Sequence, residues 1–167
     1  MAGTTETRSP GTVDWLVLVA LAGGCMALGW LASLAQTPAA DAWYDTLALP
    51  ALTPPDWVFG VVWPLLYLIM GVAAWFVWRR LRHPSAPTAL ILFAVQLALN
   101  LMWTPAFFGQ QSVAMGFYAI LPVLIAVLAT TIAFWRVSRV AGLLFLPYLA
   151  WTAFATVIAY QTWQLNA

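Results

Sequence analysis

The sequence predicts an all-α membrane protein built as a bundle of five transmembrane helices. Hydrophobic residues make up 64% of the 167-residue chain, the mean hydropathy is +0.90, and charged residues make up 7%, against about 25% in soluble domains. Runs of about 20 apolar residues, enough to cross a bilayer, occupy residues 13–34, 57–78, 88–108, 112–135 and 141–163. We therefore expect a polar tail at 1–12 and one transmembrane domain at 13–167.

The first run, 13–34, is predicted to be a retained helix. The segment "ASLAQ" that ends it resembles a signal-peptide cleavage site. However, the run is longer than a signal core, and Asp14 stands where such a peptide carries positive charge. Cys25 lies in this run and is the single cysteine of the chain, which excludes an internal disulfide and a cysteine-based metal site.

The connection at 37–56 is predicted to be a lid over one end of the bundle. The stretch "WYDTLALPALTPPDWVFGVVW" begins in this connection and contains three tryptophans and three prolines, but no basic residue. Prolines remove backbone donors and stiffen the chain, so we expect an extended segment folded over the bundle mouth. The acids of this region are Asp41, Asp45 and Asp56.

The arginines predict the orientation of the bundle, since basic residues are retained on the cytoplasmic side. They lie before the first span and in the second and fourth connections: Arg8, Arg79, Arg80, Arg82, Arg136 and Arg139. The N-terminus is therefore predicted to be cytoplasmic and the lid exterior or periplasmic. A net charge of +1 without any lysine excludes nucleic acid as a partner.

The third and second spans carry polar and aromatic side chains at helical spacing. Gln96 and Asn100 are four residues apart, as are Trp63 and Tyr67, so each pair shares one helix face. The two amides must point into the bundle. They either form hydrogen bonds between helices or, in the case of Asn100, contact a ligand.

Tyr148 and Trp151, three residues apart in the last span, form a further aromatic face. Three such faces would enclose a flat, mostly apolar cavity suited to a planar ligand; ordinary aromatic core packing is the alternative. Tryptophans at span ends are expected to lie at the membrane interface: Trp15, Trp57, Trp78, Trp135 and Trp163.

Several kinds of site are missing from the sequence. The span interiors contain no ionisable acid, base or histidine that could form a proton relay or a coupling site, and there is no catalytic triad, carboxylate pair or metal-ligand cluster, so no metal is expected. Ala94 and Ala98 form a small-xxx-small face on the third span, which favours a homodimer or close packing within the chain.

Three sequence blocks resemble the signatures of the TspO/translocator-protein (TspO/MBR) family, the tryptophan-rich sensory proteins once called peripheral benzodiazepine receptors. They are the stretch beginning at Trp43, then "QLALNLMWTPAFFG", and finally "LFLPYLAWTAFAT". The resemblance implies the TspO/MBR fold, a dimer, and a cavity that binds protoporphyrin IX, haem precursors or other flat apolar molecules, in tetrapyrrole metabolism or stress signalling. It implies no cofactor, the porphyrin being a ligand or a substrate.

Together, the residue patterns and the resemblance yield twelve candidate ligand-binding residues: Trp43, Tyr44, Trp57, Phe59, Trp63, Tyr67, Gln96, Asn100, Trp103, Phe107, Tyr148 and Trp151. Trp43 and Trp57 are also expected to anchor the lid at the interface. The resemblance implies a second possible function, light- and oxygen-dependent porphyrin degradation, with Trp63 and Trp151 as its catalytic residues. A third is facilitated transport of porphyrin or lipid.

The chain departs from the family pattern where basic or aromatic residues are usual. These positions hold Leu49, Leu52, Gln110 and Gln111. The lid is therefore expected to bind an anionic porphyrin less tightly than the lids of other family members. Gln164 follows Val157 and Tyr160 where a sterol motif requires arginine, and specific cholesterol binding is not predicted. The expected location is a bacterial cell membrane, while the resemblance leaves an outer or mitochondrial membrane open.

Overall fold

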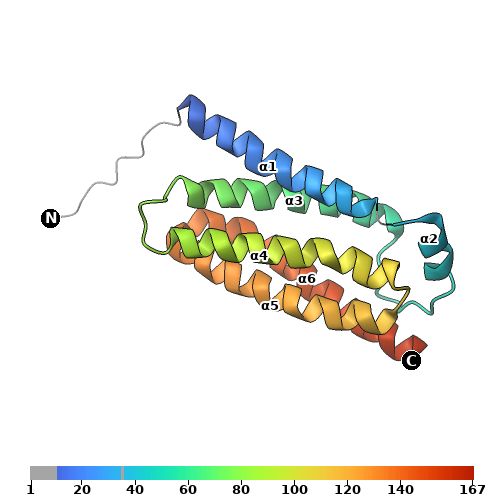
Figure 1. Ribbon diagram of the computed structural model, residues 1–167. Coiled ribbons are helices and arrows are strands. Elements are labelled where there is room, and N and C mark those ends of the chain that lie inside the picture. The colour runs from blue at the N-terminus through green and yellow to red at the C-terminus, as the bar shows by residue number, and fades with distance from the viewer. Residues whose placement is uncertain (1–10, 35) are drawn as a thin grey trace.

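The computed structural model describes residues 11–34 and 36–167, which fold into helices joined by short connections (Figure 1). Five helices of the described residues are long and apolar enough to cross a membrane, which confirms the predicted fold class. The elements are α1 (Thr12–Ser33), α2 (Pro38–Tyr44), α3 (Asp56–Trp78), α4 (Ala86–Thr104), the π-helical turn η1 (Pro105–Gly109), α5 (Val113–Val137) and α6 (Arg139–Asn166). The predicted tail falls, apart from Gly11 and Thr12, outside the described residues.

The long helices lie side by side and alternate in direction, so that the two ends of the bundle differ in what they carry (Figure 1). Helix α1 packs mainly on α3, α3 also packs on α6, and α5 packs on both α4 and α6. The α3–α4 and α5–α6 connections share the end where α1 begins, whereas α2 and the C-terminus lie at the opposite end. We call this opposite end the lid end.

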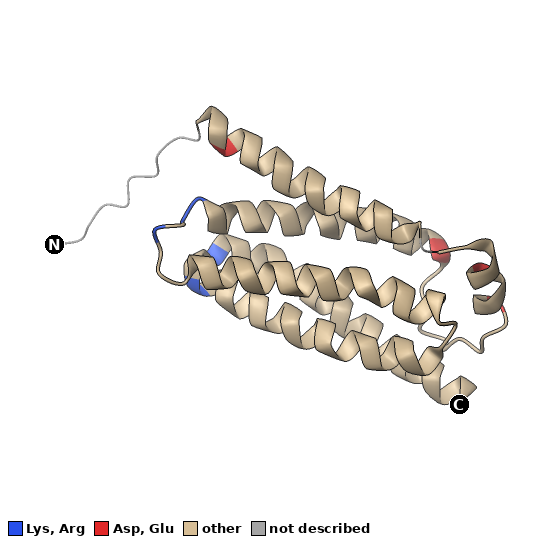
Figure 2. Ribbon diagram, viewed as in Figure 1, with Lys and Arg blue, Asp and Glu red and all other residues tan. Residues whose placement is uncertain are grey.

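Charge is divided between these two ends (Figure 2). The arginines of the described residues lie in or next to the α3–α4 and α5–α6 connections, away from the lid end. Three of the four described acids lie at the lid end: Asp41, Asp45 and Asp56. This is the asymmetry on which the predicted orientation depends.

The predicted spans differ from the helices mainly at their ends. Helix α6 is longer than predicted and begins at Arg139, because the Ser138 side chain accepts a hydrogen bond from the Ala141 amide and caps it. The third span does not stay α-helical to its end. Pro105 removes a backbone donor there, and the chain continues as the wider turn η1.

The lid, defined as residues 37–56, is not extended throughout, and that expectation was wrong for Pro38–Tyr44. This segment forms helix α2, whose N-cap Thr37 accepts a hydrogen bond from the Ala40 amide at 3.2 Å. Pro38 occupies the first turn and Asp41 complements the helix dipole there. The segment "TPAAD" thus carries helix-start signals within the predicted lid.

The core lies between α3, α4, α5 and α6, and α1 is attached to one side of it. Phe93, Phe134 and Phe145 pack together with ring centroids 4.9–6.2 Å apart. Helix α1 buries only Ala22 and Cys25. A Cβ atom on Gly71 of α3 would collide with the backbone of α1 at Ala22, so this glycine permits the close contact of the two helices.

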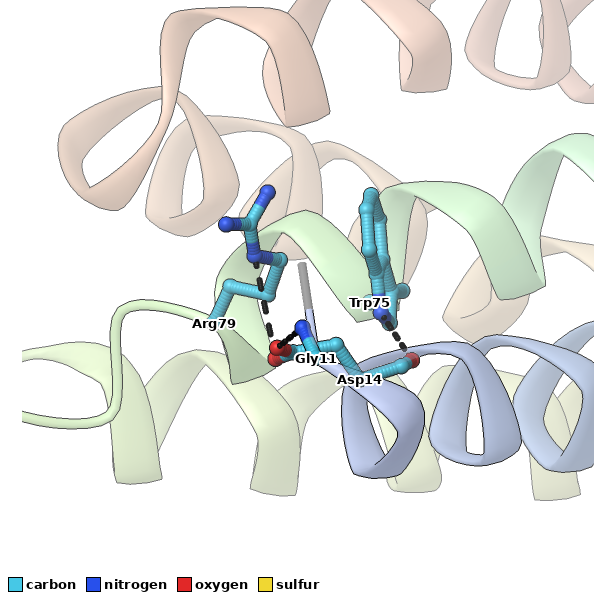
Figure 3. Close-up of polar contacts among 4 residues, drawn as sticks. All are labelled: Gly11, Asp14, Trp75 and Arg79. Atoms are coloured by element: carbon cyan, nitrogen blue, oxygen red, sulfur yellow. Dashed lines mark hydrogen bonds and ion pairs between the residues drawn. The ribbon is translucent and has the colours of Figure 1, made fainter. Parts of the chain in front are cut away.

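Polar contacts fasten the start of α1 to the end of α3 (Figure 3). The Trp75 indole donates a hydrogen bond to the Asp14 carbonyl at 2.7 Å, and the Asp14 carboxylate lies 3.8 Å from Arg79 Nε. The Arg79 guanidinium also lies over the Trp75 ring, 5.0 Å from its centroid. Trp15 stacks on Trp75 at 5.9 Å, so this predicted interface residue has a packing role as well.

Candidate functional site

A polar cluster forms where α3, α4 and α6 meet. Phe59, Trp63 and Tyr67 are spaced four residues apart and follow one face of α3. The Tyr67 hydroxyl donates a hydrogen bond to Asn100 Oδ1 of α4 at 2.8 Å. Both side chains are buried, which confirms that Asn100 points into the bundle. The Tyr67–Asn100 bond thus joins two of the predicted polar and aromatic faces directly.

Helix α6 contributes two hydrogen-bonding groups to the same cluster. The Tyr148 side chain is fully buried, and its hydroxyl faces the Asn100 and Thr152 side chains without the geometry of a hydrogen bond to either. The Trp151 indole nitrogen is also buried without a partner, although its ring is partly exposed and packs edge-on against Phe59 at 5.8 Å. Leaving a buried donor unpaired costs about 1–3 kcal/mol, so a hydrogen bond from either group to an added acceptor would be favourable.

Gln96 lies one turn from Asn100 on the same face of α4 and is fully buried, as predicted. Its amide nitrogen contacts the Met70 sulfur at 3.9 Å, a weak hydrogen bond, and its amide oxygen has no partner. The two amides thus differ: the Asn100 side-chain oxygen accepts a hydrogen bond from Tyr67, whereas the Gln96 side-chain oxygen remains an unpaired acceptor inside the bundle.

Gly29 of α1 makes room for the cluster and was missed by the sequence analysis. A Cβ atom at this position would overlap the Tyr67 ring, so the absence of a side chain sets where that ring lies. A glycine inside an apolar run gives no local sign of such a contact, because the two residues belong to different helices.

A second group of predicted residues lies under the lid. Trp43 packs edge-on against Phe107 of η1 at 5.2 Å, and Tyr44 contacts Phe107 at 6.1 Å and Phe108 at 5.8 Å. Trp103 stacks on Phe107 at 5.2 Å and donates a hydrogen bond to the Gly116 carbonyl at 2.9 Å. These residues dock α2 onto η1, and Phe108 was not among the predicted ones.

The lid environment also affects Tyr44. Burial, followed by the nearby carboxylates of Asp56 and Asp45, raises the pKa of the Tyr44 hydroxyl above its usual value. The side chain is therefore neutral at physiological pH and can act as a hydrogen-bond donor.

Trp57 is not brought to either group. It is 71% exposed at the start of α3, a position that suits an interfacial tryptophan. The twelve predicted residues thus divide into the polar cluster, the lid contacts and one exposed anchor.

A cavity of about 430 Å³ lies at the lid end, and none of its lining residues belongs to the polar cluster. Its lining includes Trp43, Thr46 and Leu47 of the lid, Gln111 before α5, and Trp163 and Asn166 of α6. The cavity is thus bordered by the lid, the start of α5 and the end of α6.

The polar cluster combines aromatic side chains with a few buried polar atoms. Aromatic walls and a few convergent polar atoms are the usual features of a site for a planar apolar ligand. Among the described residues no group of three or more His, Cys, Asp or Glu side chains is placed to hold a metal ion.

Comparison with known proteins agrees with this reading of the fold. Residues 16–164 match the TspO/MBR family. The chain is 39% identical to the tryptophan-rich protein TspO of Chlorobaculum tepidum, over 90% of this chain and 96% of the relative. It is 35% identical to the tryptophan-rich sensory protein of Cereibacter sphaeroides, over 92% and 94% of the two chains.

A human relative is also similar. The chain is 42% identical to the human translocator protein over 74% of this chain and 75% of the relative. The family match covers nearly all of the five-helix bundle, including the lid and the polar cluster. The chain is therefore a multi-pass integral membrane protein of the TspO/MBR family of receptors and sensors.

Proposed function

We propose that this protein binds a tetrapyrrole, such as protoporphyrin IX or a haem precursor, or another flat apolar molecule, at the polar cluster. The observation that carries the proposal is the pair of buried, unpaired groups on α6, the Tyr148 hydroxyl and the Trp151 indole nitrogen. In a membrane-embedded bundle an unpaired donor is costly. A ligand acceptor would relieve that cost while the ligand plane lies against aromatic rings.

The neighbouring side chains support a flat ligand. Trp63 packs on Tyr67 with ring centroids 5.7 Å apart, and Phe59 packs on Trp151. Trp63 and Trp151 are both partly exposed at the edge of the core, so a ligand reaching the cluster contacts their faces. Binding there would be sensed through the contacts of α3, α4 and α6.

The test is a titration of the purified protein in detergent with protoporphyrin IX, followed by quenching of tryptophan fluorescence. In the double variant Tyr148→Phe/Trp151→Phe the two unpaired groups are removed and the aromatic walls are kept. At about 1 kcal/mol for each of the two hydrogen bonds, the dissociation constant should rise about thirtyfold. Trp30→Phe, on an exposed face of α1, is the matched control and should leave it unchanged. Equal affinity of the double variant and the wild type would refute the site.

A second candidate function is photo-oxidative degradation of a bound porphyrin. It is favoured by the position of two electron-rich indoles, Trp63 and Trp151, at the same cluster. Illumination of the complex in air should make the porphyrin Soret band decay faster than that of free porphyrin in detergent. Decay at the same rate would leave binding and sensing as the function.

We also propose that the protein forms a homodimer through α4. Ala94 and Ala98 are exposed on this helix, so their small side chains would let a second copy approach closely. The variant Ala94→Leu/Ala98→Leu should then elute as a monomer in mild detergent. The control Ala153→Leu, at an exposed alanine of α6, should not change the elution.

A further inference from the structure

The lid is fastened to the bundle at two places. At the first, α2 docks through Trp43 and Tyr44 on Phe107 of η1. At the second, the part of the lid that follows α2 reaches the end of α6 at Ala48. The contacts of Trp43 and Tyr44 are aromatic, whereas those at Ala48 are hydrogen bonds to the backbone.

Asn166 makes both of the hydrogen bonds at Ala48. The Ala48 amide donates to Asn166 Oδ1 at 2.9 Å, and Asn166 Nδ2 donates to the Ala48 carbonyl at 2.9 Å. The side-chain amide therefore acts as a neighbouring β-strand would, satisfying the donor and the acceptor of a single residue. Nδ2 also donates to the Thr162 carbonyl at 2.7 Å, which fixes the orientation of the amide on α6.

Gln111 makes a second polar contact with the lid. Its Nε2 donates to the Ala39 carbonyl of α2 at 3.2 Å. The backbone of Gln111 has a φ of 46°, in the left-handed region that non-glycine residues seldom adopt. The turn between η1 and α5 thus presents this side chain to the lid.

These hydrogen bonds differ from the Tyr67–Asn100 bond in their surroundings. The bonds from Asn166 to Ala48 and from Gln111 to Ala39 are exposed, so water can replace either partner when they break. Both residues also line the cavity between the lid and the ends of the spans. Breaking the bonds at Ala48 would therefore free the wall of the cavity formed by Thr46 and Leu47.

We propose that Asn166 is the latch of the lid: a positioning residue whose paired hydrogen bonds to Ala48 set how often the lid opens. A flat apolar ligand passes between the lid and the end of α6 each time this latch is released. This inference rests on the proposed function for its ligand, but the latch itself is a property of the lid alone.

Hydrogen–deuterium exchange tests the latch without any ligand. In Asn166→Ala the exchange of the lid peptide that contains Ala48 should become about tenfold faster. Asn166→Asp keeps an acceptor for the Ala48 amide but loses the donor to its carbonyl, so its exchange should be intermediate. Leu165→Ala, at an exposed neighbour of Asn166 on α6, is the matched control and should exchange as the wild type does. Helical content and elution volume confirm that each variant is folded.

Stopped-flow mixing with protoporphyrin IX then tests passage of the ligand. If the latch sets the frequency of opening, Asn166→Ala should raise the association and dissociation rates by the same factor, about tenfold, and leave the dissociation constant unchanged. A loss of ligand contacts would instead raise mainly the dissociation rate.

The outcomes separate the two proposals. Unchanged exchange at Ala48 in Asn166→Ala would overturn the latch, and faster exchange with unchanged ligand rates would overturn the assigned route. If the wild type does not bind protoporphyrin IX, the proposed function fails for that ligand, and the exchange experiment still decides the latch.

Discussion

Two partly exposed tryptophans allow a test of how the unpaired indole at the polar cluster affects stability. Trp151 and Trp103 are both partly exposed, but the Trp103 indole donates to the Gly116 carbonyl at 2.9 Å, whereas the Trp151 indole nitrogen is buried without a partner. Replacement by Phe removes the N–H in each case and keeps an aromatic ring. The same chemical change is thus made in opposite surroundings.

The two replacements should differ in their effect on the free energy of unfolding. Loss of the second indole ring costs roughly 1 kcal/mol of buried apolar area in either variant. In Trp103→Phe a hydrogen bond worth about 1 kcal/mol is also lost, for a total of about 2 kcal/mol. In Trp151→Phe the removal of an unpaired donor, which costs about 1–3 kcal/mol, offsets the lost area, so stability should be unchanged or higher.

The assay is thermal unfolding of the purified variants in the same detergent, followed by circular dichroism. For a chain of this size about 1 kcal/mol corresponds to about 2–4 °C, so Trp103→Phe should melt about 4–8 °C below the wild type and Trp151→Phe at or above it. If Trp151→Phe melts as low as Trp103→Phe, the Trp151 nitrogen is not an unpaired donor, and the argument for an acceptor-bearing ligand fails with it.

Three further predictions concern packing, charge and orientation. Gly29→Ala should lower the free energy of unfolding by about 1–3 kcal/mol, because the added Cβ meets the Tyr67 ring. The control Gly24→Ala, at a position with open space around it, should be neutral or should raise the free energy of unfolding by up to about 1 kcal/mol through helix propensity. A similar loss in both variants would exclude a specific role for Gly29. The dimethyl ester of protoporphyrin IX should bind more tightly than the dianionic acid, because the acidic residues at the lid end repel the ligand's carboxylates. Salt should reduce this difference in affinity, and so should replacement of Asp41, Asp45 and Asp56 by Asn. An affinity difference that grows with salt would contradict the prediction. A reporter enzyme fused after Ala167 should be active only outside the cytoplasm, since the arginines lie at the other end of the bundle, and cytoplasmic activity would reverse the predicted orientation.

Much of the architecture is local information and could be predicted from the sequence. An apolar run of sufficient length forms a transmembrane helix whatever it packs against, because a helix satisfies its own backbone hydrogen bonds in the bilayer. The same is true of the faces: Trp63 with Tyr67, and Gln96 with Asn100, follow from helical spacing alone. The helix α2 was missed because the proline-rich lid was expected to be extended, although a proline in the first turn, here Pro38, also begins helices.

The sequence by itself determined the number of spans, the division of charge between the two ends and the inward direction of the amides Gln96 and Asn100. Only the tertiary structure decided which inward groups meet: Tyr67 is bonded to Asn100, Tyr148 and Trp151 have no partner, and Trp57 lies outside. It also brought Asn166 to Ala48, 118 residues away in the chain. The physical reason is that periodicity fixes the face of one helix, whereas a hydrogen bond or a close contact depends on the offset and rotation between two helices, which their packing sets.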